Sequence, residues 1–443
     1  MLPGWASGFY GYRDCHIDLA SMAAYAGARL ITAEATGLDV QSRHILIGNS
    51  ASSGCDTASG EASTQQRQEQ QQPFEESSQE RVPYDVLSID IGITPGSSGV
   101  PGAATLATPV KPIDSFVQRY EALLERFRQA AAAAAAAAES AAGKADAGPL
   151  LRVAVVGGGA GGVELAAAVR YRLDAERRKG GWRQEAVGDV EVSLVCRGGL
   201  LAGHPPHVRR LVRRLLAERR VAVLEGDAVA RVEPTELMLA GGARVPYDEC
   251  LWCTAAAPAA WLRDTGLPTD RDGFISITET MQCEGGPAEV FAAGDVASSA
   301  RHPRPKAGVY AVRQGPPLAA NVMALLQGRP LQPFVPQRTA LALISMGDRF
   351  CVASRTGGQA GTAAGSHGKG AEGDGPEWPL GWLLNGGGGR AAWSGPLLWA
   401  WKDRIDRAFM RKYGEDLMAG NAELQGPSEG LRAAGGSDRT HAD

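Results

Sequence analysis

Short apolar runs alternate with amphipathic stretches through the middle of the chain, and this alternation predicts strands and helices in turn. The apolar runs at 151–156, 190–196 and 221–224 predict strands because each is short and rich in valine or leucine. The stretches at 162–173 and 207–219 have the apolar spacing of helices. The order strand, helix, strand, helix, strand is typical of a parallel, doubly wound α/β sheet.

The first part of the chain predicts further strands, and compositionally biased tracts interrupt the pattern. Residues 29–38 and 44–47 predict a strand pair, and 84–91 predicts another strand. Residues 48–81 are polar and rich in glutamine, which predicts a disordered insert. Residues 130–149 continue an amphipathic helix into polyalanine, which predicts a helix extension followed by a linker. Two more tracts are predicted as a charged loop and a Gly-rich insert, at 176–189 and 356–395.

Charge and composition exclude several classes of protein. The 45 Lys and Arg against 49 Asp and Glu give a net charge of −4, so we expect no nucleic-acid partner. No apolar run approaches the roughly 18 residues that a membrane-spanning helix needs. The seven cysteines are odd in number and scattered, which favours reduced thiols in an intracellular, reducing compartment. The first residues carry no signal-peptide or transit-peptide pattern, and the compartment stays open, a mitochondrion or plastid included.

Three glycines follow the apolar run at 151–156. Gly157, Gly159 and Gly162 have the G-x-G-x-x-G spacing between a predicted strand and a predicted helix. In such a turn the first glycine permits the tight turn, the second lets the backbone approach a pyrophosphate, and the third lets the helix pack on the strand. The segment predicts a site for NADH or NADPH. A glycine-rich turn that binds nothing is the alternative.

Two charged residues near this turn each have two interpretations. Arg197 follows the second strand, where a site that prefers NAD usually has an acidic residue. An arginine there would neutralise the 2′-phosphate of NADPH, or it would simply face solvent on a loop. Glu164, placed in the first turn of the predicted helix, would contact the nicotinamide ribose or complement the helix dipole.

Segments spread over nearly the whole chain, outside the inserts, resemble FAD- and pyridine-nucleotide-dependent oxidoreductases with two dinucleotide folds. The narrower resemblance is to the branch of type II NADH dehydrogenases and apoptosis-inducing-factor relatives, and within it to the oxidoreductase module fused to selenide, water dikinase. The segments that carry it are MLPGW at the start, CHIDL at 15–19, YDVLSIDIGITP at 84–95, KPIDSFVQRYEALL at 111–124, KAGVYAVRQGPPLAANV at 306–322 and WAWKDRIDRAFMRKY at 399–413.

The resemblance implies a second cofactor site, for FAD. It implies that Asp295, in the pair Gly294-Asp295, hydrogen-bonds a ribityl hydroxyl of FAD, although Gly-Asp is also a common turn pair. It further implies that a short segment passes close to the isoalloxazine ring, where a backbone amide stabilises reduced flavin. The residues of that segment are Lys306, Ala307, Gly308 and Val309.

The resemblance also implies how the chain is divided. We expect two Rossmann-like domains, with the NAD(P)-binding domain at 150–265 inserted in an FAD-binding domain at 1–149 and 266–335. A C-terminal α+β or helical segment is expected at 336–443. Family members begin with a βαβ unit whose glycine turn holds the ADP part of FAD, and that unit is missing here. We expect a truncated start or, as the alternative, a natural fragment that has lost tight FAD binding.

The cysteines suggest a competing chemistry. Cys250 and Cys253 form a C-x-x-C pair, as in thiol-disulfide reductases. On a strand, residues three apart lie about 10 Å from one another and face opposite sides, beyond the roughly 7 Å limit for a disulfide. We therefore expect buried strand cysteines, with the thiol-disulfide reductase as the alternative. No cluster of Cys and His has metal-ligand spacing, so we expect no metal.

The C-terminal segment concentrates aromatic and basic residues on an amphipathic helix. Such a helix would lie at a membrane interface, or cap the flavin domain, or form a homodimer contact. Type II dehydrogenases use this region to reach the bilayer and quinone. The residues are Trp378, Trp382, Trp393, Trp399, Trp401, Lys402, Arg404, Arg407, Arg411 and Lys412.

The function that we predict is electron transfer from NAD(P)H through FAD to a small acceptor such as a quinone. Hydride transfer between two bound cofactors needs orientation more than an acid or base, so we assign no catalytic residue. The alternatives are the thiol-disulfide reductase and a non-catalytic remnant that binds nucleotide without stable FAD.

Overall fold

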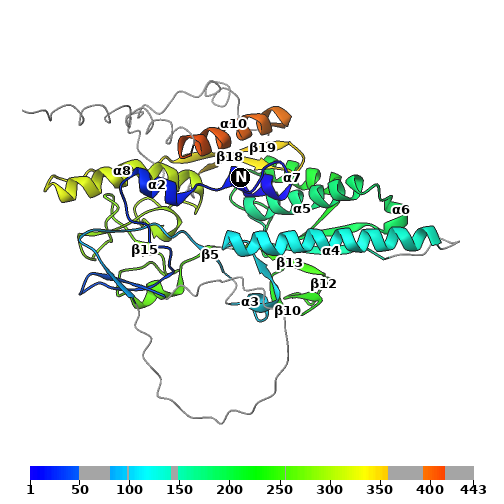
Figure 1. Ribbon diagram of the computed structural model, residues 1–443, viewed down its shortest axis with the longest axis horizontal. Helices are drawn as coiled ribbons and strands as arrows, with labels where there is room; N and C mark the ends of the chain where they lie inside the picture. The colour runs from blue at the N-terminus through cyan, green and yellow to red at the C-terminus, as the bar shows by residue number, and fades with distance from the viewer. Residues whose placement is uncertain (49–79, 97–98, 141–147, 255, 358–392, 415–443) are drawn as a thin grey trace, which may run out of the picture. The chain divides into compact units, whose positions relative to one another are not determined.

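The chain forms two compact units, each assembled from segments that are distant in the sequence (Figure 1). Unit 1 comprises Met1–Leu30, Ser97–Thr254 and Thr339–Asp443, and unit 2 comprises Ile31–Gly96 and Ala255–Arg338. The computed structural model describes residues 1–48, 80–96, 99–140, 148–254, 256–357 and 393–414. Most of the predicted insert at 48–81 and of the Gly-rich tract at 356–395, with Trp378 and Trp382, therefore lies outside the described residues.

Unit 1 is built on a five-stranded sheet in the order β6-β13-β7-β8-β9, in which every neighbouring pair is parallel. Helix α5 (Ala160–Lys179) leads from β7 to β8, and α7 (Pro206–Glu218) leads from β8 to β9. The predicted Rossmann-like, parallel α/β fold is thereby confirmed, but α5 and α7 pack on the same face of the sheet and an antiparallel sheet covers the other, so the sheet is not doubly wound. The strands are β6 (Thr108–Pro109), β7 (Leu151–Val156), β8 (Val190–Cys196), β9 (Val221–Glu225) and β13 (Glu249–Trp252).

The central strand β7 is buried on both faces, which explains its continuous run of apolar residues. Val153 and Val155 point into one core, together with residues of α5. Ala154 and Val156 point into a second core on the other face. A three-stranded antiparallel sheet covers that second core, with strands β10 (Val229–Val232), β11 (Glu236–Leu239) and β12 (Arg244–Pro246).

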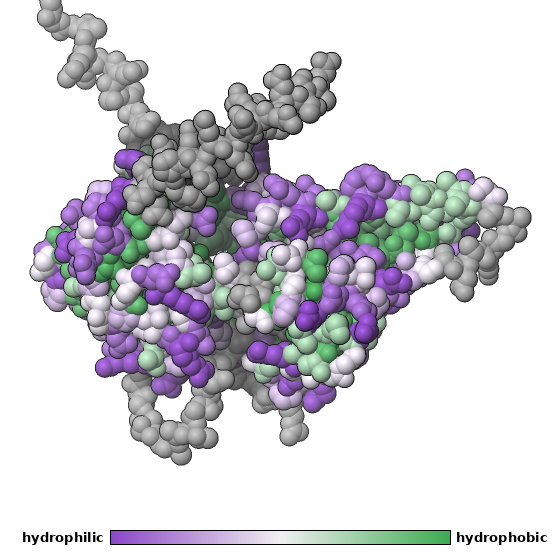
Figure 2. Space-filling view, turned by 90° about the horizontal axis from the view of Figure 1, so that it is seen from below, coloured by the Kyte–Doolittle hydropathy of each residue, from purple (hydrophilic) through white to green (hydrophobic). Residues whose placement is uncertain are grey.

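Helix α4 (Ile113–Ser140) packs its first half into the core of unit 1 and continues through the polyalanine tract. Phe116, Leu123 and Phe127 are fully buried, whereas most alanines from Ala132 onward are partly or fully exposed. In Figure 2 this end of α4 is a pale green, mildly hydrophobic surface. Alanine extends the helix by propensity but offers no side chain for packing.

The predicted loop at 176–189 is largely helical, which corrects the prediction. Helix α5 continues to Lys179 because Glu176, buried near its end, accepts ion pairs from Arg128 at 2.8 Å and Arg172 at 3.0 Å. Helix α6 (Gln184–Val187) follows after a short turn. The charges that suggested a solvated loop hold α4 and α5 together instead.

The N- and C-terminal segments complete unit 1. An antiparallel sheet pairs β18 with β19 and β19 with β20, and α10 follows β20 directly. Trp399 of α10 packs edge-on against Phe9, with ring centroids 5.4 Å apart. These elements are α1 (Leu2–Ala6), α2 (Leu19–Tyr25), β18 (Thr339–Ser345), β19 (Cys351–Gly357), β20 (Ser394–Gly395) and α10 (Pro396–Lys412). The short helix α3 (Ala103–Leu106) belongs to the middle segment of unit 1 and precedes β6.

Unit 2 holds an antiparallel sheet of β1, β2 and β3 and a parallel pair of β4 with β16. The strand β3 begins at Glu80, inside the tract predicted as an insert. Helix α8 (Gly308–Leu326) follows β16 and β17. The strands are β1 (Ala35–Asp39), β2 (His44–Ile47), β3 (Glu80–Pro83), β4 (Leu87–Ile89), β5 (Thr94–Pro95), β14 (Ala256–Ala257), β15 (Ile275–Ser276), β16 (Val290–Ala292) and β17 (Ala297–Ser298).

Among the described residues, no helix is both long enough and apolar enough to span a bilayer.

Candidate nucleotide-binding sites

The glycine turn of unit 1 links β7 to α5. Gly157 has a φ of +136°, and a Cβ there would overlap the carbonyl oxygen of Cys253. A Cβ on Gly162 would overlap the carbonyl oxygen of Gly157, so α5 packs directly against the turn. At Gly159 no atom lies within 4 Å of an added Cβ, and α5 starts at the next residue without a side-chain cap. The turn is thus packed at two glycines and open at the third, which suits a pyrophosphate at the helix N-terminus.

Arg197 lies exposed at the carboxyl end of β8, directly after the buried Cys196. Within the described parts of the chain, its guanidinium makes no hydrogen bond or ion pair. The loop that follows is held by Glu225, which accepts the Leu200 N–H and pairs with Arg213 at 2.6 Å. Partial burial would raise the pKa of Glu225, but Leu200 and Arg213 lower it overall. The loop is therefore anchored, while the arginine beside it stays open to a ligand.

Glu164 lies beyond the first turn of α5, because the helix begins at Ala160, and this corrects its predicted position. Its Oε1 accepts the backbone N–H of Ser345 at 2.8 Å, which ties α5 to β18. Burial raises the pKa of Glu164, against the opposing effects of Lys402 and of the Ser345 N–H. Lys402 in turn pairs with Asp406 at 2.6 Å. The structure therefore gives Glu164 a partner within the protein, and a contact with the nicotinamide ribose stays a prediction.

Cys250 and Cys253 are both free and belong to different cores of unit 1. Cys250 lies in the core beside β10–β12, and Cys253 packs against the core on the opposite face of the sheet. Burial raises the pKa of the Cys250 thiol to about 12 and raises that of Cys253 further. Neither thiol has the low pKa of a redox-active cysteine. No group of three or more metal-ligating side chains occurs among the described residues.

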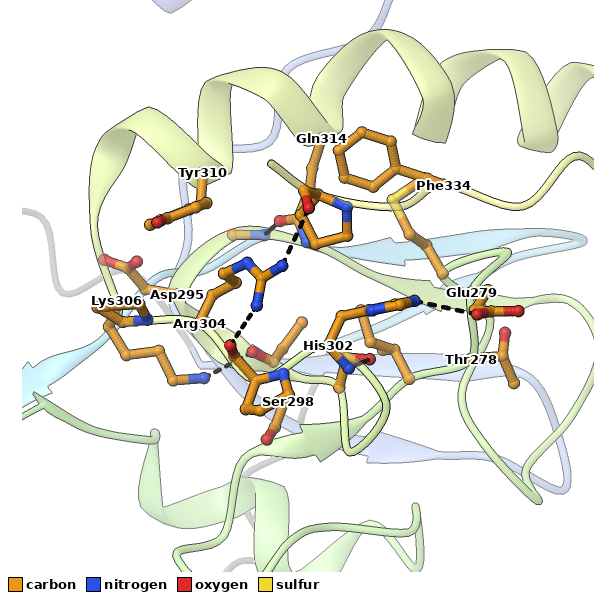
Figure 3. A pocket seen from close by; sticks show the side chains of 18 residues that line it. Thr278, Glu279, Asp295, Ser298, His302, Arg304, Lys306, Tyr310, Gln314 and Phe334 are labelled. Atoms are coloured by element: carbon orange, nitrogen blue, oxygen red, sulfur yellow. Dashed lines mark hydrogen bonds and ion pairs between the residues drawn. The ribbon is translucent and has the colours of Figure 1, made fainter. Parts of the chain in front are cut away.

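Unit 2 contains a cavity of about 110 Å³ beneath the start of α8 (Figure 3). Its wall is formed by residues 277–281, by residues 294–314, which run from the turn after β16 through a loop into α8, and by residues 334–336. Tyr310 and Gln314 extend from α8 toward that loop, which carries Arg304 (Figure 3). These three stretches, which are separate in the sequence, converge on one small volume.

Most of the charged groups on the cavity wall are already bonded within the protein. Lys306 donates its Nζ proton to the Ala297 carbonyl at 2.6 Å and lies 3.9 Å from the centre of the Phe274 ring. Burial lowers the pKa of Lys306, and Asp270 and Asp295 oppose this effect. His302 lies 3.0 Å from Glu279. Arg304 donates to three backbone carbonyls, those of Pro303, Pro336 and Gln337.

The residues predicted for the second cofactor fall into two groups. Gly294, Asp295 and Lys306 line the cavity. Ala307 is the N-cap of α8, and Gly308 and Val309 form its exposed start. The structure therefore brings the two predicted segments together in unit 2, and their contact with FAD stays a prediction.

Tyr310 and Gln314 line the same cavity and were missed by the sequence analysis. Both belong to the segment KAGVYAVRQG that carried the resemblance, so the signal was present in the sequence. Their four-residue spacing places them on one face of α8. Nothing in the sequence tells which face, because that depends on the packing of α8 over the Gly294 turn.

The described residues thus form an α/β protein with a glycine turn at the start of a helix in unit 1 and a polar cavity in unit 2. Residues 23–315 match the family described as pyridine nucleotide-disulphide oxidoreductase, and the chain belongs to this family. The family uses FAD and NAD(P)H. The finer resemblance, to the module fused to selenide, water dikinase, stays a prediction.

The chain is similar to two curated relatives, and it shares its fold with one solved structure. A demethylphylloquinone reductase of Synechocystis is 29% identical over 190 residues, which cover 41% of this chain and 44% of the relative. An NADH dehydrogenase-like protein of Mycobacterium tuberculosis is 25% identical over 333 residues, 72% of this chain and 68% of the relative. The sulfide:quinone oxidoreductase of Aquifex aeolicus superposes with a TM-score of 0.60 at 15% identity, over 93% of this chain and 82% of that one. The chain thus spans about half to two thirds of the length of these two curated relatives.

Proposed function

We propose that this chain is an FAD-dependent NAD(P)H oxidoreductase that passes electrons to a quinone. The observation that carries the proposal is the glycine turn of unit 1. Gly157 and Gly162 are required by packing, whereas Gly159 faces open space at the start of a helix. If the turn only linked the strand to the helix, packing would not require a glycine at position 159, whereas a pyrophosphate that approaches the backbone there would.

In unit 1 the pyrophosphate of NAD(P)H is bound at the Gly157–Gly162 turn and the N-terminus of α5. Arg197 then binds the 2′-phosphate of NADPH, because it is exposed at the end of β8 and bonded to no other described side chain. This assignment predicts a preference for NADPH over NADH.

In unit 2 the flavin nucleotide is held at the cavity beneath α8. Bound FAD would supply a two-electron acceptor for hydride from NAD(P)H. Asp295 accepts hydrogen bonds from ligand hydroxyls, and Ala307, Gly308 and Val309 offer the backbone at the start of α8. Lys306, withdrawn from water beside Phe274, gives the cavity wall a positive charge that favours electron-rich ligands.

A quinone acceptor is supported by the demethylphylloquinone reductase among the relatives. Peripheral contact with a membrane through α10 would bring the protein to such an acceptor. Leu397 is 84% exposed at the start of α10, and Trp393 just before it is also exposed. By contrast Trp399, Lys402 and Arg407 face other parts of unit 1 or pair within the helix. We place the membrane contact at the start of α10, and a homodimer contact there stays an alternative prediction.

The proposal is tested by an absorption spectrum of the full chain purified with added FAD. We expect flavin absorption that bleaches anaerobically on addition of NADPH, more weakly on addition of NADH, and returns with a water-soluble quinone. A colourless protein that still binds NADPH would contradict the proposal and favour a nucleotide-binding remnant. Thiols that titrate only after NADPH addition would favour a disulfide reductase. We do not expect this result, because Cys250 and Cys253 lie on opposite faces of the sheet.

A further inference from the structure

The cavity beneath α8 contains two polar groups that make no hydrogen bond to any of the described residues. Tyr310 is only 7% exposed, yet no described residue lies within hydrogen-bonding distance and geometry of its hydroxyl. The Asp295 carboxylate acts on Lys306 only through its charge. Buried polar groups in native proteins almost always have a partner, so an unpartnered hydroxyl on a cavity wall indicates a missing ligand.

The remaining wall limits the chemistry of that ligand. The positive groups Lys306 and Arg304 already donate to backbone carbonyls, and His302 is paired with Glu279. What is left is a carboxylate, which accepts hydrogen bonds, and a phenol, which both donates and accepts. A phosphate would meet the negative charge of Asp295. A chain of hydroxyl groups satisfies both side chains at once.

Gln314 fixes the geometry of this pair. Its Oε1 accepts the backbone N–H of Gly294 at 2.7 Å. Gly294 has a φ of +71° and directly precedes Asp295. Tyr310 and Gln314 are one helical turn apart on α8, so a single face of the helix supplies the phenol and holds the turn that carries the carboxylate (Figure 3).

We infer that Tyr310 is a second hydroxyl-binding residue of the flavin site, which binds the sugar-alcohol chain of the nucleotide together with Asp295. This inference rests on the proposed function, since it names the part of FAD that the cavity recognises. It assigns Tyr310 a role in binding and Gln314 a role in positioning Asp295.

Tyr310→Phe tests the inference because it removes only the hydroxyl. We expect the dissociation constant for FAD, measured by fluorescence titration of the full chain, to rise about three- to tenfold, the effect of one hydrogen bond. Affinity for lumiflavin, which has the ring system without the sugar-alcohol chain, should not change. A lumiflavin affinity too weak to measure in the unsubstituted protein also supports the inference, because binding then depends on that chain.

Tyr84→Phe is the matched control. Tyr84 lies in the same unit, and its hydroxyl is likewise buried without a partner, but it does not line the cavity. The Tyr84→Phe substitution should leave the affinity for FAD unchanged. Neither variant removes a hydrogen bond of the ligand-free protein, so neither should lower the Tm measured without flavin. A lower Tm for Tyr310→Phe would indicate a structural role and overturn the inference.

Two further outcomes separate this inference from the proposed function. If the unsubstituted chain binds FAD and Tyr310→Phe binds it equally well, or loses lumiflavin affinity to the same degree, the inference is wrong and the proposed function stands. If the unsubstituted chain binds neither FAD nor riboflavin, both are wrong.

Discussion

The glycine turn of unit 1 and the cavity of unit 2 differ in which atoms they leave free for a ligand. Around the turn the charged side chains are engaged within the protein: Glu164 accepts from Ser345, and Glu225 pairs with Arg213. The ligand is left with backbone groups and one exposed arginine. In the cavity Arg304 and Lys306 are likewise engaged, by backbone carbonyls, but a side-chain group is left for the ligand, because the Tyr310 hydroxyl has no partner among the described residues.

This difference shows two ways to build a nucleotide site. A ligand that is bound by backbone groups needs positions where no side chain blocks its approach, so such a site depends on where glycine is required. Side-chain recognition depends on groups that are unfavourable until the ligand arrives. Substitutions at the turn should therefore affect packing and phosphate binding separately, whereas substitutions in the cavity should affect binding more than folding.

The largest effect is expected where unit 1 buries charge beside the turn. Lys402→Met removes the cation near Glu164 and Asp406 but keeps most of the side-chain volume. We expect the free energy of unfolding to fall by about 3 kcal/mol at neutral pH, at the lower end for a buried pair because about a fifth of the Lys402 side chain remains exposed. Urea unfolding measures this value. Lys412→Met, on the exposed end of the same helix, should change it by less than about 0.5 kcal/mol.

The loss of unfolding free energy in Lys402→Met should depend on pH, in a direction that follows from the pKa of Glu164. Burial raises the pKa of Glu164 in the folded state, so its contribution to stability is complete below the unfolded pKa and is lost as the pH rises through the folded pKa. Removing Lys402 raises that pKa further. The deficit of Lys402→Met should thus be largest near pH 7 and shrink toward about pH 4, where carboxyl groups become protonated. A deficit that is equal at both pH values would mean that lost packing, not charge, causes it.

The next effect separates packing from binding within the turn itself. Gly162→Ala brings a Cβ against the Gly157 carbonyl, so we expect a loss of about 1–3 kcal/mol in unfolding free energy. Gly159→Ala meets no atom within 4 Å and should fold normally while its dissociation constant for NADPH rises roughly tenfold. Gly148→Ala, which also meets no atom within 4 Å but lies outside the turn, before β7, is the control for both. Normal NADPH affinity in Gly159→Ala would contradict a pyrophosphate at this position.

The comparison also explains how much the sequence could predict. The strands β7 and β8 have the bounds that their apolar runs predicted, and the glycine spacing predicted the turn. These features are local: consecutive buried residues define a strand in a parallel sheet, and three glycines define a phosphate-binding turn.

What the sequence could not predict depends on contacts between distant segments. Glu164 was placed in the first helical turn, whereas its partners are Ser345 in β18, 181 positions later, and Lys402 in α10, further still along the chain. The loop predicted at 176–189 was helical because Glu176 binds an arginine of α4. The free hydroxyl of Tyr310 follows from the face that α8 turns to the cavity, which no spacing in its own segment determines.

A smaller effect is expected from the one side chain that the turn leaves for the ligand. Arg197→Gln should raise the dissociation constant for NADPH roughly tenfold, the loss of one charged contact to a phosphate, and leave that for NADH unchanged. Isothermal titration with both nucleotides measures the ratio. Arg210→Gln, an exposed arginine on α7, should alter neither. Equal losses for both nucleotides would show that Arg197 does not read the 2′-phosphate.

The smallest effect is expected at Gln314, which lines the cavity and whose Oε1 is engaged by the Gly294 N–H. Gln314→Met keeps the volume but removes the acceptor of the Gly294 N–H, so the turn that carries Asp295 loses its tether. We expect the dissociation constant for FAD to rise about three- to fivefold, with NADPH affinity in unit 1 unchanged. Gln314→Glu, which retains an acceptor oxygen, should restore part of the FAD affinity. Because Gln314 acts through Asp295, adding Gln314→Met to an Asp295→Asn variant should weaken FAD binding little further, and a fully additive loss would show that Gln314 contacts the ligand itself.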